Sequence, residues 1–111
     1  MPMKKHVALL LLLVPTSAFA QSAENGQKLF MAYACYSCHG TLGQGSGDVG
    51  AKLAPDGPDL AAIKQELRHP AARMPAYSES VLPDEQVADI AAYLHSIPKS
   101  KPASEIPLLN H

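Results

Sequence analysis

The interpretation of this chain is decided by the stretch Cys35-Tyr36-Ser37-Cys38-His39. Its two thiols are three positions apart, so on a helical turn they lie on one side and can add to the two vinyl groups of one porphyrin. The histidine that follows is then held under the ring, where an imidazole nitrogen reaches the iron. These residue types at this spacing are typical of a c-type haem attachment site.

The first twenty residues have the pattern of a cleaved export signal. Two lysines open the segment, an apolar run covers residues 7–14, and Ala18-Phe19-Ala20 has the small-x-small form of a signal-peptidase site. The 8 apolar residues of this run are too few for a membrane span, which needs about 20. We therefore expect residues 1–20 to be removed, so that the mature chain begins at Gln21 and has no membrane span.

The mature chain is expected to be small and mildly acidic. The full sequence has 9 basic and 10 acidic side chains, and loss of the two leader lysines leaves 7 against 10, a net charge of −3. Nucleic acid is not an expected partner, because phosphate binding needs a concentrated positive face. Both cysteines lie in the motif, so no disulfide remains to stabilise the thin core of a domain this small. A covalently bound apolar cofactor would complete such a core.

Apolar spacing predicts three helices and no strand, which is an all-α fold. The first helix covers about residues 22–34, with Ser22 as a candidate N-cap. A short middle helix covers about residues 60–67 and ends before a proline. The last covers about residues 83–97, between a Pro-Asp-Glu start and Pro98. The residues expected to face the core are Gly26, Leu29, Phe30, Tyr33, Leu60, Ile63, Leu67, Val87, Ile90, Ala91 and Leu94, with Tyr93 beside the last stripe.

Two segments lie outside these helices. Residues 40–57 hold six of the seven glycines, and Gly45 to Gly50 match the dinucleotide fingerprint G-x-G-x-x-G. No strand precedes this match and no helix directly follows it, so we interpret the segment as a flexible loop that wraps one edge of a cofactor. The Pro-rich tail, residues 99–111, ends in an apolar stretch that includes Ile106 and Leu109. It is either loosely packed or a peptide that docks on its own domain or on a partner.

Met74 is the best candidate for the axial position of the iron opposite His39. It lies 35 residues after His39 and is followed by a proline, which favours an extended backbone in a loop. A methionine is most often simply core, but a haem on the same chain favours the ligand role. Met31 lies one helical turn before Cys35, on the His39 side of the ring, so we expect it to pack in its helix. The remaining candidates are His69, His95 and His111.

The mature chain resembles the class I cytochromes c over almost its whole length. The features that carry the resemblance are Gly26, Phe30 and Tyr93 for a crossing of the first and last helices, the Cys35 to His39 motif, Gly57-Pro58-Asp59-Leu60, and Met74-Pro75. The resemblance implies a small cytochrome c fold, with three main helices and loops wrapped around one covalent haem c. The expected organisation is a leader at 1–20, a cytochrome c domain at 21–98 and the tail.

The resemblance also implies the site residues. Cys35 and Cys38 would hold the haem covalently, and His39 and Met74 would bind the iron. The carbonyl of Pro58 would accept a hydrogen bond from His39, which orients the imidazole and raises its donor strength. Arg68 and Arg73 flank the methionine and are candidates either for pairing with the haem propionates or for ordinary solvated charges.

The implied function is a carrier of single electrons and not an enzyme. Ligation by Met and His saturates the iron, and the thioether raises the reduction potential relative to two histidines. In bacteria c-type haem is attached after export, so the implied location is the periplasm. The implied partners are redox proteins, namely a donor such as a dehydrogenase and a downstream cytochrome or oxidase. Two versions stay open, a free monomeric shuttle and the haem subunit of a periplasmic dehydrogenase complex.

The main alternative is a haem-based sensor or gas-binding protein in which Met74 detaches and a small ligand takes its place. A Cys/Cys/His zinc site would need a fourth ligand and usually a second ligand cluster. A thioredoxin-like dithiol would need a βαβ context that this sequence lacks. Electron transfer therefore remains the leading hypothesis.

Overall fold

The computed structural model describes residues 2–3 and 21–109. Apart from Pro2 and Met3, the predicted export signal lies outside the described residues, and so does His111. The described part is all-α and has no strand, which confirms the predicted fold class. Its elements are α1 (Ala23–Ala32), α2 (Tyr36–His39), α3 (Leu60–Arg68), α4 (Asp84–Ser96) and two 3-10 turns, η1 (Ala103–Glu105) and η2 (Pro107–Leu109).

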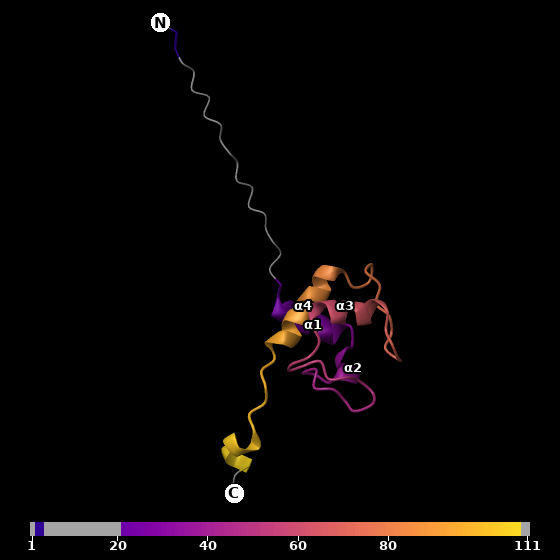
Figure 1. Ribbon diagram of the computed structural model, residues 1–111, viewed down its shortest axis with the longest axis vertical. Helices are drawn as coiled ribbons and strands as arrows, with labels where there is room; N and C mark the ends of the chain where they lie inside the picture. The colour runs from indigo at the N-terminus through magenta and orange to yellow at the C-terminus, as the bar shows by residue number, and fades with distance from the viewer. Residues whose placement is uncertain (1, 4–20, 110–111) are drawn as a thin grey trace.

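Helices α1 and α4 cross in close contact and form the centre of the domain (Figure 1). Gly26 lies at the crossing, where an added Cβ would overlap the backbone carbonyl of Asp89, so a glycine is required for the close approach. One turn further along, the rings of Phe30 and Tyr93 are 5.5 Å apart and tilted by 59°. The predicted crossing residues are therefore confirmed.

The start of α1 is fastened directly to α4. The Ser22 hydroxyl caps α1 by accepting from the Asn25 amide at 3.0 Å, as predicted. The Ser22 amide in turn donates to the Asp89 carboxylate at 2.7 Å, and the Asn25 side chain donates to its other oxygen at 2.8 Å. One carboxylate on α4 thus holds both the backbone and a side chain at the beginning of the domain.

Helix α3 completes the core by packing against α4. Its N-cap is Asp59, whose side chain accepts from the Ala62 amide at 2.8 Å. The buried core consists of Phe30, Ala54, Ile63, Leu67, Leu82, Val87, Ile90, Ala91, Tyr93 and Leu94. Ala54 and Leu82 are the two members that apolar spacing did not predict, because they lie in irregular segments where no helical period marks a core position.

The tail leaves the helical body after α4, and its two 3-10 turns lie apart from the helices (Figure 1). Near its start Lys99 forms an ion pair with Asp56 at 3.1 Å. At its end Leu108 and Leu109 are 80% and 61% exposed. Within the described residues no helix is long and apolar enough to cross a membrane.

Candidate haem-binding site

The Cys35 to His39 motif is placed by a tight reversal at the end of α1. Helix α1 is capped at Tyr33, and Ala34 then takes a left-handed conformation with φ 59°. The Cys35 amide donates back to the Phe30 carbonyl at 3.0 Å, and the His39 amide donates to the Cys35 carbonyl at 3.0 Å. The motif therefore forms one helical turn anchored on the core, as its spacing predicts.

The two thiols of the motif differ in exposure. Cys35 is half-buried and packs against the core, whereas Cys38 is exposed, and neither forms a disulfide. Burial raises the pKa of the Cys35 thiol, so this thiol is protonated at neutral pH. Burial also raises the pKa of Tyr77, and negative charge at Cys35 and then at Cys38 raises it further.

The imidazole of His39 is oriented by the carbonyl of Ala51. Its Nδ1 lies 2.7 Å from that oxygen, and because a carbonyl only accepts, Nδ1 carries the proton. Nε2 is left as the lone-pair nitrogen that can bind a metal. The carbonyl of Pro58 instead faces His95 on α4, with Nε2 of that residue at 3.0 Å. The predicted hydrogen bond from His39 to Pro58 is therefore wrong.

Two segments of the chain have a similar sequence and could each supply the acceptor for His39. They are Gly50-Ala51-Lys52-Leu53 and Gly57-Pro58-Asp59-Leu60. The proline favours the second segment when the sequence is searched for a Gly-Pro-x-Leu pattern. In the structure the first segment lies against the motif. Gly50 approaches the Cys38 carbonyl so closely that an added Cβ would overlap it. Ala51 is thus the site residue that the sequence analysis missed. The shared Gly-x-x-Leu spacing was the signal that could have found it.

The glycine-rich loop folds back onto the motif through main-chain contacts. The Leu53 and Ala54 amides both donate to the Gly43 carbonyl, at 2.7 and 3.0 Å. The Gly45 amide donates to the His39 carbonyl at 2.7 Å, and the Ser46 hydroxyl donates to the Cys38 carbonyl. No strand precedes this loop in the described chain, so its glycines do not form a dinucleotide-binding unit.

Met74 shares the core with Cys35. It is half-buried in the irregular segment between α3 and α4, and it packs against the same cluster of core residues as Cys35 and Tyr77. Met31 was expected to pack in its helix, but it is 42% exposed on α1 and does not fill the helix interface. His69 and His95 are exposed. Two thiols outside any disulfide, an imidazole with a free Nε2 and a half-buried thioether are the donors that a covalent haem with His and Met ligands needs.

Arg68 has partners within the protein. Its guanidinium donates to the Tyr77 carbonyl at 2.9 Å and to the Asp84 carboxylate at 2.7 Å. Lys64 donates to the other oxygen of Asp84 at 2.9 Å. The hydrogen bonds from Lys64 and then Arg68 hold the pKa of Asp84 below its usual value. Arg68 is therefore not an ordinary solvated charge, whereas Arg73 is exposed, and pairing of either residue with a haem propionate stays a prediction.

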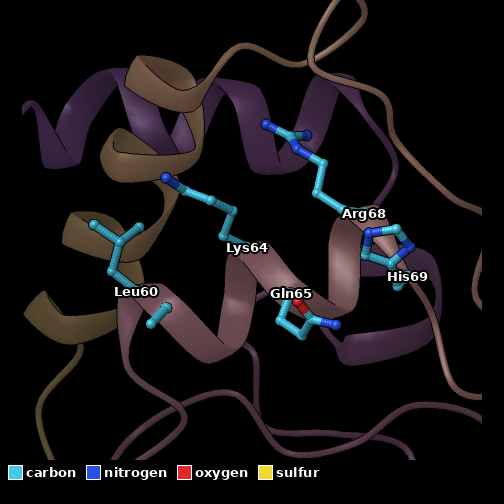
Figure 2. Close-up of a pocket in the computed structure, with 6 residues that line it drawn as sticks. Leu60, Lys64, Gln65, Arg68 and His69 are labelled. Carbon is cyan, nitrogen blue, oxygen red and sulfur yellow. The ribbon is translucent and has the colours of Figure 1, made fainter.

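A hollow of about 470 Å³ runs along one flank of α3 (Figure 2). Its lining residues are Leu60, Ala61, Lys64, Gln65, Arg68 and His69. None of the residues of the motif lines this hollow, and neither does Met74. Among the described residues no group of three or more His, Cys, Asp or Glu side chains is arranged to hold a metal ion.

Comparison with known proteins gives one family. The family described as cytochrome c oxidase, cbb3-type, subunit III matches residues 21–94, well over half of the chain. The matched segment begins before α1 and ends at Leu94, the last buried residue of α4. It includes the motif and Met74. No curated protein and no solved structure matches the chain.

Proposed function

The chain belongs to the cytochrome c family described as cbb3-type cytochrome c oxidase subunit III, and from this membership we propose that it carries single electrons between redox proteins of the periplasm. It is a mono-haem cytochrome c domain with one haem c attached to Cys35 and Cys38. Proteins of this class transfer electrons and are not typically catalysts.

In the proposed site His39, through Nε2, and Met74, through its sulfur, would hold the iron. The haem supplies a one-electron couple of the iron. The Ala51 carbonyl holds the imidazole in one tautomer and one orientation, which strengthens its donor nitrogen. The observation that carries the proposal is this hydrogen bond together with the packing of Met74 on the same core as Cys35. With His39 and Met74 as its ligands, the iron would have no open site for a substrate, and the protein would fix the ligands and keep water away.

The decisive experiment is a comparison of two methionine variants of the holoprotein. Met74→Ala should abolish the methionine-to-iron charge-transfer band of the oxidised protein and lower its reduction potential, because the thioether raises the potential. Met31→Ala is the matched control, since Met31 is exposed on α1, and it should change neither property.

The sensor alternative makes the opposite forecast. A protein whose Met74 is readily displaced would show a high-spin spectrum and bind carbon monoxide rapidly without denaturant. That result in the wild-type protein would reject the electron carrier in favour of the sensor. His39→Ala should prevent assembly of a normal holoprotein under either function, because both need the proximal ligand.

For the partner we propose a redox protein that receives the tail. The domain is taken as residues 21–98, and residues 99–111 present Leu108 and Leu109 largely exposed, as a peptide that docks on another protein would. Deletion of residues 99–111 should weaken partner binding and leave the haem spectrum unchanged. Unchanged electron-transfer kinetics with the native donor would contradict a docking role.

The charge of the mature chain provides a second test of the partner. A net charge of −3, with added negative charge from the haem propionates, favours a partner face that carries basic residues. Association should therefore slow as ionic strength rises. A rate independent of salt would mean that the contact is apolar alone. The same measurement on the tail-deleted protein separates the charged contribution from that of the tail.

A further inference from the structure

We propose that Arg68 is a positioning residue for the axial methionine. Its hydrogen bond to Tyr77 forms a latch that ties residues 71–77, the Met74 loop, to α3. This latch limits how often the Met74 sulfur leaves the iron. This inference rests on the proposed role of Met74 as a ligand. It goes beyond that role because it assigns the stability of the bond between Met74 and the iron to groups that do not touch the iron.

Tyr77 is held at three points. Its amide donates to the Leu67 carbonyl at 2.8 Å, its carbonyl accepts from Arg68 at 2.9 Å, and its hydroxyl donates to the Tyr33 carbonyl at 3.1 Å. Its ring also meets the Tyr33 ring edge-on, with centroids 5.9 Å apart and an angle of 84°. One residue thus ties the loop to both α3 and the end of α1.

Tyr77 is the first such anchor after Met74. In the described part of the chain, the nearest hydrogen bonds on either side of Met74 are those of Ala71 and Tyr77, since the Ala71 amide donates to Glu66 at 2.9 Å. The stretch of chain between these anchors carries the thioether and is held by packing. The position of the sulfur therefore depends on how firmly Tyr77 stays in place.

Arg68 is suited to hold Tyr77 because it is itself fixed. One of its terminal nitrogens donates to Tyr77 and the other to the Asp84 carboxylate at 2.7 Å, which uses the planar fork of the guanidinium. The Arg68 side chain is only 16% exposed, so solvent screens this arrangement less than an ordinary surface pair. The guanidinium joins α3, the Met74 loop and the first residue of α4.

The segment that follows Tyr77 is also fastened. The Tyr33 hydroxyl donates to the Val81 carbonyl at 2.8 Å, and Leu82 beside it is fully buried. The two tyrosines therefore hold the segment after Met74 from both ends against α1. A movement of Tyr77 away from α3 would break these contacts, so the contacts oppose an opening that starts at Tyr77.

Lys64 provides a matched control within the same helix. It pairs with the same carboxylate as Arg68, at 2.9 Å, and it extends from the same side of α3 (Figure 2). Its described contact is with Asp84 and not with the loop. Removing Lys64 therefore weakens the charge pair without cutting the connection to Tyr77, whereas removing Arg68 does both.

The experiment measures how fast imidazole binds to the ferric holoprotein, because an added ligand reaches the iron only when Met74 has left it. Arg68→Gln should raise the imidazole binding rate about tenfold, since it removes charged hydrogen bonds from the latch. Lys64→Gln should stay within about twofold of the wild type. Arg68→Lys keeps a cation beside Asp84 but not the fork, so its rate should lie between those of the wild type and Arg68→Gln.

Amide hydrogen exchange at Tyr77 gives a readout independent of the iron. The Tyr77 amide should exchange faster in Arg68→Gln than in Lys64→Gln, because only the first variant frees the residue. If Arg68→Gln does not accumulate, Tyr77→Phe removes the bond to the Tyr33 carbonyl and should raise the imidazole rate several-fold. Equal imidazole rates and equal exchange in Arg68→Gln and Lys64→Gln would overturn the latch.

Failure of the ligand assignment would look different. In that case the wild-type protein would lack the methionine-to-iron band, and Met74→Ala would leave its imidazole rate unchanged. The latch as a control of the iron ligand would then be rejected together with the ligand. If the wild-type band is present and Met74→Ala speeds imidazole binding, equal rates in the two α3 variants reject the latch alone.

Discussion

The two sides of the proposed haem site are held by different kinds of contact. On the His39 side the contacts are made chiefly by the main chain. The Ala51 carbonyl accepts from His39, Gly50 lies close against Cys38, and the Leu53 and Ala54 amides donate to the Gly43 carbonyl. On the Met74 side they are made by side chains, chiefly those of Arg68, Tyr77, Tyr33 and Asp84.

This difference determines how each side responds to substitution. A main-chain contact survives most changes of side chain and is disturbed mainly when bulk is added where none fits. A side-chain contact is lost with the side chain that makes it. The His39 side should therefore fail abruptly at its glycines and tolerate change elsewhere, whereas the Met74 side should weaken step by step.

The largest effect is expected from Gly50→Ala. The added Cβ would overlap the Cys38 carbonyl, so the loop must move away from the motif, at a cost of about 3 kcal/mol or more in the free energy of unfolding. Denaturant unfolding of the holoprotein, with the yield of attached haem, measures the loss.

Gly47→Ala is the control for Gly50→Ala. Gly47 also lies in the loop, with φ +59°, but a Cβ there meets nothing within 4 Å. Its cost should be about 1 kcal/mol, from backbone conformation alone. Equal losses in the two variants would show that the approach of Gly50 to Cys38 does not hold the His39 side together.

The next effect concerns Asp84 and acid. Because the pKa of Asp84 is lowered in the folded protein by hydrogen bonds from Lys64 and Arg68, its charged form stabilises the fold above the usual pKa of 3.8. That stabilisation is lost as the pH falls through the lowered pKa. Asp84→Asn should therefore be less stable than the wild type at neutral pH.

The difference between Asp84→Asn and the wild type should shrink to nothing in strong acid, where the carboxyl of Asp84 is protonated. Urea unfolding of both proteins from neutral pH to well below 3.8 measures this difference, and contributions shared by the two proteins cancel. A difference that stays constant across the range would mean that the ion pair does not support the Met74 side.

A smaller effect is expected from Ser46→Ala. The Ser46 hydroxyl donates to the Cys38 carbonyl, and it is one of the few side-chain contacts on the His39 side. Its loss should lower the free energy of unfolding by about 1 kcal/mol and leave the haem spectrum unchanged. A spectral change would indicate that the loop holds the motif through this hydroxyl and less through its backbone.

The smallest effect is expected from Pro58→Ala. Since His39 pairs with Ala51 and the Pro58 carbonyl faces His95, this variant should keep the wild-type reduction potential and the wild-type nitrogen chemical shifts of His39. NMR of the reduced protein and a redox titration provide the measurement. A shifted potential would reinstate Pro58 as the residue that orients the proximal imidazole.

The helices were predictable because buried apolar residues repeat with the helical period. The predicted first helix, 22–34, is observed as Ala23–Ala32, the middle one, 60–67, as Leu60–Arg68, and the last, 83–97, as Asp84–Ser96. The motif was predictable because covalent chemistry dictates its spacing. These features depend on local sequence alone, and so they can be read without knowing the fold.

The partners of Ala51 and Arg68 were harder to predict, because their own residue types do not reveal them. Every residue has a carbonyl, so nothing in the side chain of Ala51 marks it as the acceptor for His39, and the proline at position 58 attracted the assignment instead. Arg68 could point in several directions from α3, and its partner Asp84 lies 16 residues further along the chain. Such pairings become visible only when the helices are in place.

The bond between Ser22 and Asp89 joins residues that are 67 positions apart, and it bears on when the protein folds. Helix α1 buries Phe30 mainly against α4, so the core cannot close while α4 is still missing from a growing or threading chain. Until then the segment that carries Cys35 and Cys38 has little to pack against. We therefore expect the Cys35 thiol, which is half-buried in the folded domain, to stay fully accessible to haem attachment until almost the whole domain has emerged, whereas Cys38 is exposed before and after folding.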